Sequence, residues 1–172
     1  MNRLQELEEK MKDLLRMHPD ILGNIKDDIT SSAEIKYLDA KYDHDFLKAG
    51  DAAAVLFHGT NHFCEVIKSG ALKGNPLCLA CDFDSAWVYQ SSRNLNAAVF
   101  AIMKKGVDYD SLHFVATQVR TYNPVKVNGN SIRYIKFQCN KEEFNRLPDE
   151  CRKLALSLGI PLISDSGDSI HG

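Results

Sequence analysis

Residues 54–60 read Ala-Val-Leu-Phe-His-Gly-Thr, and this segment constrains the fold more than any other part of the chain. A short apolar run between polar segments is typical of a buried strand, so we predict a strand here. The strand delivers His58, Gly59 and Thr60 directly into a turn. Polar groups at the end of a rigid strand are well positioned to bind a ligand.

The next segments alternate in character. Residues 61–70 predict a helix that Gly70 ends. Residues 76–80 predict a second short strand, and residues 81–89 predict a helix that carries Trp87 and Tyr89. The order is therefore strand, helix, strand, helix, with a polar His-Gly-Thr group at the end of the first strand.

This order, together with the step from Asp82 to Tyr89, resembles the ADP-ribosyltransferase superfamily. The resemblance covers residues 55–89 of the 172. It implies an α+β fold, with an ADP-ribosyltransferase-like split sheet and surrounding helices. We place this domain at residues 51–172 and a helical amino-terminal extension before it, at residues 1–50.

Composition limits the classes of function. With 172 residues and 44% apolar content, the chain can bury one core, which fits a single domain with an added element. The formal net charge is -2, and the 21 basic residues are spread without a block. The sequence therefore gives no support for a nucleic-acid partner, without excluding one.

The cysteines bear on compartment and metal binding. Their number, 5, is odd, and no signal-like apolar run opens the chain, which favours a reducing cytoplasm or delivery into a host cytosol. Cys78 and Cys81 form a C-x-x-C pair, but two thiols do not complete a tetrahedral zinc site, so we expect no metal. No run of about 18 apolar residues occurs, so we expect no membrane contact.

The amino-terminal extension begins with an amphipathic helix. Residues 2–17 place leucines and Met11 at helical spacing among glutamates and lysines, and His18-Pro19 is expected to end the helix. Residues 20–50 are polar and mixed, with a turn or helix start at 27–32. The extension is expected either to pack on the core or to offer helix 2–17 to a partner.

The second half of the chain predicts more strands and helices in alternation. Between residues 82 and 106 we expect helical structure, interrupted near 91–94. The other predicted elements are strands at 112–119, 124–127, 132–138 and 160–163, and helices within 141–158, where Pro148 opens the second segment and Gly159 ends it.

The resemblance also assigns roles. In the superfamily the strand histidine hydrogen-bonds the ribose next to the adenine, the following glycine meets the nicotinamide carboxamide through its backbone, and an aromatic ring stacks on the nicotinamide. His58, Gly59 and Tyr89 occupy these positions, with Thr60 beside them, and NAD would be a substrate. From the residues alone, His58 could instead be a buried histidine bonded to a carbonyl, and Tyr89 a core residue beside Trp87.

The third role implied by the resemblance belongs to an acid that stabilises the positive charge developing on the ribose. The predicted strand 132–138 carries no acid, so the candidates are Asp165 and Asp168 after the last strand. The same Asp-Ser-Gly-Asp segment is also typical of a solvated carboxyl terminus.

Other polar residues are weaker candidates for a functional role. Asp84 is expected to cap the helix that follows it, with Asp82 nearby. Arg93, Arg120 and Arg133 are all candidates for binding a pyrophosphate, and nothing in the sequence selects among them.

The implied activity is NAD-dependent mono-ADP-ribosyl transfer to a macromolecule, above all a protein, by an enzyme that looks like a bacterial or phage effector or toxin. One alternative is a catalytically silent binding module of the same fold. Another is a tRNA 2'-phosphotransferase-like enzyme, although Phe57 lies where that family has an arginine nearby. A cysteine nucleophile, Cys64 or Cys81 beside a histidine, has no supporting spacing.

Overall fold

The structure of the chain, a computed structural model, describes residues 1–21, 32–88 and 94–170. Its strands are β1 (Ala54–Thr60), β2 (Ala71–Leu72), β3 (Leu77–Ala80), β4 (Ala98–Met103), β5 (His113–Val115), β6 (Gln118–Thr121), β7 (Val125–Lys126), β8 (Ile132–Phe137) and β9 (Leu162–Ile163). Its helices are α1 (Arg3–Met17), α3 (Ser32–Lys48), α4 (Phe63–Ser69), α5 (Phe83–Trp87), α6 (Lys141–Phe144) and α7 (Asp149–Ser157), with short 3-10 turns η1 (Lys104–Gly106) and η2 (Tyr109–Ser111).

The fold is α+β, as predicted. Within the described residues, seven strands form one mixed sheet in the order β5-β6-β3-β1-β4-β8-β9, and β2 pairs with β7 in a two-stranded sheet. Neighbouring strands are antiparallel except β8 and β9, which are parallel. The strand that carries His58, β1, therefore lies at the centre of the larger sheet.

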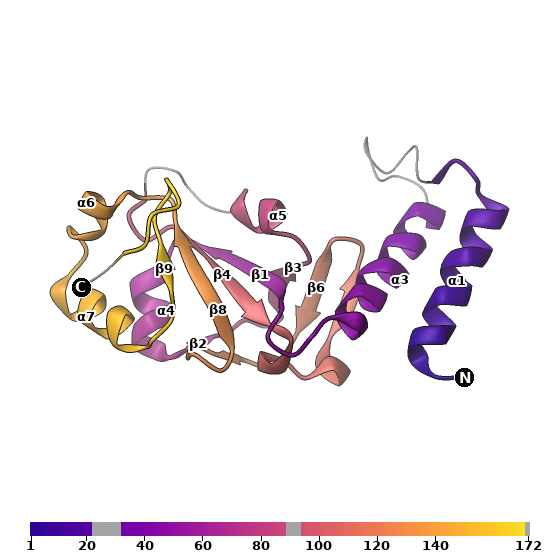
Figure 1. Ribbon diagram of the computed structural model, residues 1–172, viewed down its shortest axis with the longest axis horizontal. Coiled ribbons are helices and arrows are strands. Elements are labelled where there is room, and N and C mark those ends of the chain that lie inside the picture. Colours follow the sequence, from indigo (N-terminus) through magenta and orange to yellow (C-terminus); the bar gives the residue numbers. More distant parts are fainter. Residues whose placement is uncertain (22–31, 89–93, 171–172) are drawn as a thin grey trace.

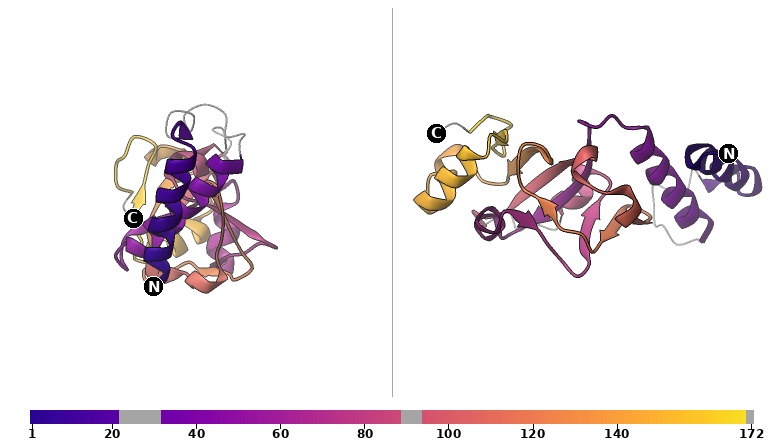
Figure 2. Two further views of the ribbon diagram at one scale, coloured as in Figure 1. Left: turned by 90° about the vertical axis from the view of Figure 1, so that its right-hand side faces the viewer. Right: turned by 90° about the horizontal axis from the view of Figure 1, so that it is seen from below.

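The molecule is elongated (Figure 1), with α1 and α3 side by side at one end and α6 and α7 at the other. The sheet lies between these two helical ends, and the view from below in Figure 2 shows the same arrangement. In the described ranges, no helix is long and apolar enough to cross a membrane.

Side chains from helices cover both faces of the sheet. On one face Phe63 of α4 packs against Phe137 of β8, with ring centroids 4.6 Å apart. On the other face Ala86 of α5 packs with Ala80 of β3 and Val99 of β4. Helices therefore lie over both faces of the central strands, which gives β1 a rigid setting.

Several predicted elements are confirmed. The strand predicted at residues 54–60 is β1, and the helix predicted after it is α4, whose C-cap Gly70 has the left-handed φ of 74°. Gly159, after α7, likewise has a positive φ of 69°. The strands predicted at 76–80, 124–127, 132–138 and 160–163 are present in shorter form as β3, β7, β8 and β9.

The prediction of helical structure from residue 82 to 106 is wrong for residues 98–103, which form β4, the central neighbour of β1. In the described part of this range, α5 and the 3-10 turn η1 are the helical segments. Every residue of β4 is buried, so its sequence shows no alternation of apolar and polar positions. A strand buried on both faces cannot be distinguished from a buried helix by periodicity.

The single strand predicted at residues 112–119 is in fact a hairpin of β5 and β6. The chain reverses at Ala116, a non-glycine residue with a positive φ of 54°. The amide of Ala116 donates to the carboxylate of Asp39, which lies on α3. The turn therefore depends on a contact from the amino-terminal extension, and the local sequence carries no turn signal for it.

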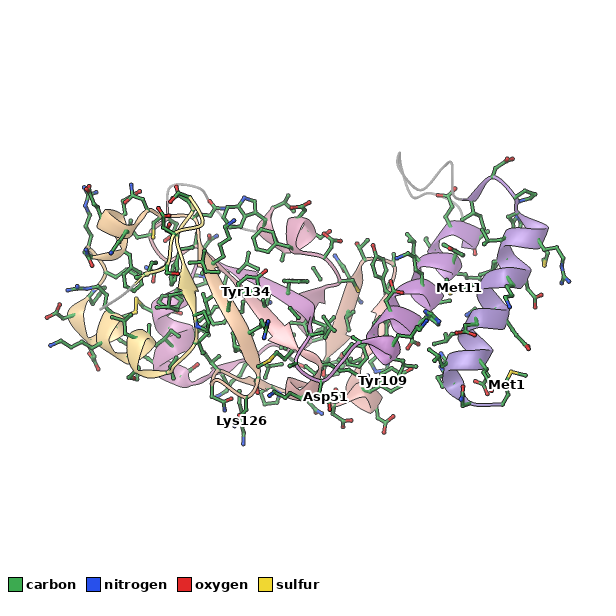
Figure 3. All side chains as sticks on the ribbon, viewed as in Figure 1. Met1, Met11, Asp51, Tyr109, Lys126 and Tyr134 are labelled. Atoms are coloured by element: carbon green, nitrogen blue, oxygen red, sulfur yellow. A yellow bond between two sulfur atoms is a disulfide. The ribbon has the colours of Figure 1, made fainter. Side chains whose placement is uncertain are left out.

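Residues 20–50, read from sequence as polar and mixed, contain the long helix α3. This helix packs on β5 and contributes Phe46 to the core, while α1 packs on α3. The carboxylate of Asp43, although buried, accepts hydrogen bonds from Tyr109 at 2.5 Å and from Arg3 of α1 at 3.2 Å. Figure 3 shows Tyr109 where the end of α3 meets the core. Buried polar residues such as Asp43 interrupt the apolar stripe, which is why the sequence pattern did not predict this helix.

Candidate functional site

A small cavity lies between β1 and β3. Its volume is about 140 Å³, close to the size of an apolar cavity that holds one benzene ring. The residues that line it come from β1, β3, α5 and β6: Phe57, His58, Gly59, Cys78, Leu79, Ala80, Ala86 and Gln118. The cavity therefore has room for one ring-sized group in a mostly apolar setting.

Unequal strand pairing opens this cavity. On one side, β1 pairs with β4 along its whole length, from Ala54 to Thr60. On the other side, Phe57 and Ala80 are the one registered pair between β1 and β3 in the described chain. Because the two strands separate beyond that pair, space for the cavity appears next to His58.

His58 bridges the separation. Its Nδ1 lies 2.8 Å from the main-chain oxygen of Cys78, and since a carbonyl oxygen only accepts, Nδ1 carries the proton and donates. Burial lowers the pKa of His58 below its ordinary value, and the hydrogen bond to Cys78 opposes this shift more weakly. The ring is therefore neutral at pH 7, and its Nε2 is a hydrogen-bond acceptor.

Gly59 leaves the cavity open. Its cross-strand partner is Val99, which packs with Ala86 of α5, so position 59 faces the same side of the sheet as α5. A side chain here would project into the cavity. The predicted neighbour of His58 therefore has a clear structural reason to be glycine.

Thr60 has a different role in the turn. Its side chain is buried, and its Oγ1 accepts a hydrogen bond of 3.0 Å from the amide of His62. Thr60 is not among the residues that line the cavity. It supports the transition from β1 to α4, and its predicted contact with NAD remains a prediction.

The predicted aromatic position, Tyr89, lies outside the described residues. Its competitor Trp87 stacks on Phe83 with ring centroids 5.3 Å apart, and Nζ of Lys136 lies 5.7 Å from the Trp87 ring. Trp87 does not line the cavity. The cap of α5 is Asp82, which accepts from the amide of Ser85 at 2.7 Å, whereas the sequence had favoured Asp84.

The structure does not bring Asp165 and Asp168 to the cavity. Both are exposed and follow β9, which is separated from β1 by β4 and β8. Three strand spacings amount to about 14 Å. The amide of Asp165 donates to Cys139 at 3.1 Å, and Asp168 accepts from Ser166 at 3.0 Å, so both residues shape the turn after β9. Their predicted catalytic role gains no support from this position.

Among the cavity residues that the sequence did not indicate, Gln118 is the one with an amide side chain. It begins β6 and pairs with Ala80 of β3, which places it next to the cavity wall. The prediction of one uninterrupted strand over residues 112–119 hid this position, because the hairpin that turns Gln118 toward β3 was not foreseen. Among the described residues that line the cavity there is no carboxylate.

Neither cysteine considered as a nucleophile, Cys64 or Cys81, is a reactive thiol. Cys64 of α4 and Cys151 of α7 are joined by a disulfide, with Cα atoms 5.5 Å apart, a pairing that the sequence did not indicate. Burial raises the pKa of Cys81 to about 12, so this thiol is protonated at neutral pH and is a poor nucleophile. Within the described ranges, no three His, Cys, Asp or Glu residues are grouped closely enough to hold a metal ion.

The exposed arginines differ in their distance from the cavity. Arg120 of β6 is the cross-strand partner of Cys78, which lines the cavity, so the two residues lie side by side on one face of the sheet. Arg133 is on β8, with β4 between it and β1. Arg93 lies outside the described residues.

Comparison of this chain with protein-family models, with curated proteins and with solved structures finds no match in any of the three. The cavity and the residues that line it are therefore the basis for inferring a function.

Proposed function

We propose that this protein is an NAD-dependent mono-ADP-ribosyltransferase of the split-sheet type, which holds NAD at the His58 cavity and passes ADP-ribose to a protein acceptor. The observation that carries the proposal is that His58 and Gly59 line one ring-sized cavity at the separation of β1 and β3. The appearance of β1, α4, β3 and α5 in that order along the chain adds support, because this order is the basis of the family resemblance.

The cavity suits the nicotinamide ring. Phe57, Leu79 and Ala86 offer apolar walls, and burying an aromatic ring among them is favourable at about 25 cal/mol per Å² of apolar surface. Without a side chain at Gly59, the ring and its carboxamide can approach the main chain of β1 closely. The rest of NAD is too large for this volume and would extend out of the cavity past the polar side chains that line it.

His58 suits a ribose. Because Nδ1 is engaged with Cys78, the neutral ring presents Nε2 as an acceptor, and a ribose hydroxyl can donate to it. The carbonyl of Cys78 fixes the orientation of the ring and the position of its proton. His58 is therefore oriented for binding before any ligand arrives.

Arg120 suits the pyrophosphate. It is exposed beside Cys78 at the cavity, and a guanidinium group pairs well with phosphate oxygens. Arg120 lies beside the cavity, whereas Arg133 lies on β8 with β4 between it and β1. We therefore assign the pyrophosphate contact to Arg120.

The second candidate is a catalytically silent module that binds NAD without cleaving it. The observation that favours it is the lack of a carboxylate among the described residues that line the cavity. Cleavage of a glycosidic bond develops positive charge on the sugar, and enzymes usually stabilise that charge with a carboxylate.

Nicotinamide release from NAD by the purified protein tests the proposal, with and without a cell lysate as the source of acceptor. The His58→Ala variant is expected to release nicotinamide at least about tenfold more slowly, because it loses the ribose contact and the orienting bond to Cys78. His62→Ala is the matched control, since His62 is an exposed histidine four residues away that does not line the cavity.

The outcomes separate the two candidates. Release that requires His58 but not His62 supports the transferase, and transfer of labelled ADP-ribose to a lysate protein completes the case. NAD binding without release favours the silent module. A protein that neither binds NAD nor releases nicotinamide contradicts both.

A further inference from the structure

Gln118 occupies a distinctive place in the cavity. It is half-buried at the first position of β6 and is paired with Ala80 of β3. Since Ala80 packs with Ala86 of α5, Gln118 lies on the same face of the sheet as Gly59. Apart from the thiol of Cys78, His58 and Gln118 are the polar side chains among the described lining residues.

The described part of the cavity wall carries no formal charge at neutral pH. The Gln118 amide does not titrate, and the His58 ring is neutral because burial lowers its pKa. Such a wall suits the uncharged nicotinamide product, yet it offers only dipoles to a cation. Charge stabilisation is commonly among the largest contributions to catalysis, and removal of one stabilising group costs about 10² to 10³ in rate.

The reaction makes charge stabilisation important. The bond between ribose C1′ and the nicotinamide nitrogen breaks, and its electron pair neutralises the positive charge of the pyridinium ring. Positive charge then develops at C1′ and its ring oxygen until an acceptor nucleophile bonds to C1′ and loses a proton to solvent. A carboxylate near C1′ accelerates this step, whereas an amide of the same shape contributes only its dipole.

We propose that Gln118 faces the nicotinamide ribose of bound NAD and limits the rate of glycosidic cleavage, because a neutral amide lies where a carboxylate would stabilise the transition state. This inference rests on the proposed function. The wild-type site accordingly binds NAD well and turns it over slowly, and glutamate at position 118 supplies the missing charge without a change of size.

The test is Gln118→Glu in the full chain, with nicotinamide release and NAD affinity measured separately. We expect release to rise by about 10- to 100-fold while the affinity for NAD changes by less than about fivefold. Release by the variant should also increase with pH through the carboxyl titration near about pH 4 to 5, while the wild type lacks that step. A purely structural role for Gln118 would produce no such pH profile.

Gln138→Glu is the matched control. Gln138 is also half-buried and follows β8, but it does not line the cavity. The Gln138→Glu variant should therefore release nicotinamide at the wild-type rate. If both variants accelerate release equally, the added negative charge acts wherever it is placed and not specifically at position 118. That result overturns the proposal.

The remaining outcomes are also decisive. A Gln118→Glu protein that binds NAD but releases nicotinamide no faster overturns this inference and leaves the proposed function intact. A wild-type protein that does not bind NAD overturns both. Should Gln118→Glu fail to fold, Gln118→Met removes the amide dipole at similar size, and release must then fall at least about threefold for the inference to stand.

Discussion

The Nδ1–H group of His58 lies 2.8 Å from the main-chain oxygen of Cys78, and this contact joins the two strands that form the cavity. Where β1 and β3 separate, a carbonyl of β3 would lack a partner from the neighbouring strand. The imidazole supplies the donor instead, so the carbonyl of Cys78 has a hydrogen-bond partner where the neighbouring strand offers none. The same contact that stabilises the separation of the strands therefore also orients the side chain for a ligand.

Stability should depend on pH through His58. Its pKa in the unfolded chain is about 6.5, and burial lowers the pKa in the folded protein. As the pH falls below about 6.5, the unfolded chain gains a proton that the folded protein does not, so the free energy of unfolding decreases by up to about 1.4 kcal/mol per pH unit. The loss ends below the folded pKa. Urea unfolding between pH 5 and 8 should show this decrease in the wild type and a smaller one in His58→Gln, and parallel curves would contradict the assignment.

A side chain at position 59 should block NAD without unfolding the protein. Gly59→Leu places about four carbon atoms in a cavity of about 140 Å³, so the affinity for NAD should fall at least about tenfold. The strand backbone accepts a side chain, and the free energy of unfolding should stay within about 1 kcal/mol of the wild type. Gly50→Leu is the control, because a Cβ at Gly50 meets nothing within 4 Å. Calorimetric titration with NAD distinguishes the two variants.

Arg120 and Arg133 should differ in their effect on NAD binding. Arg120→Ala removes a guanidinium beside the cavity, and the loss of a charged hydrogen bond of about 1.5 to 3 kcal/mol weakens binding by roughly 10- to 100-fold. Arg133→Ala removes another exposed strand arginine, on β8, and should leave the affinity unchanged. The difference between the variants should shrink in high salt, because salt screens exposed charges. If the two substitutions change the affinity for NAD equally, the pyrophosphate does not bind at Arg120.

The disulfide between Cys64 and Cys151 should contribute substantially to stability. It joins α4 to α7 across a sequence separation of 87 residues, and restricting an unfolded loop of that length is worth about 4 to 5 kcal/mol. Thermal unfolding of the oxidised protein should therefore shift to lower temperature on addition of a dithiol reductant. Cys64→Ser should show the lower stability with or without reductant. Cys78→Ser is the control, since this exposed thiol takes no part in the disulfide. Identical unfolding with and without reductant would mean that the bond does not form in solution.

Local pattern was sufficient for the strand that carries the site. Residues 54–60 have a continuous apolar start and a polar end, and this pattern predicted β1 with its actual bounds. The glycine stop after α4 was equally clear, because Gly70 adopts a conformation that other residues avoid. These features depend on neighbouring residues in the chain, so sequence reasoning could find them.

Local pattern failed where distant segments decide the conformation. β4 shows no alternation because helices cover both faces of the sheet, and the turn at Ala116 depends on Asp39 from α3. The position of Gln118 follows from that turn, so no local pattern could place it at the cavity. The separation of Asp165 from His58 likewise follows from the addition of β9 at the far edge of the sheet.

The sequence by itself determined that a histidine and a glycine would stand at the end of a strand, because strand formation and turn formation are local. Only the tertiary structure decided which groups surround them. It separated β1 from β3, turned His58 toward Cys78 and brought Gln118 into the cavity, while it kept the carboxyl-terminal aspartates away. These relationships depend on strand order and register, which arise from long-range packing and cannot be deduced from the spacing of residues along one chain.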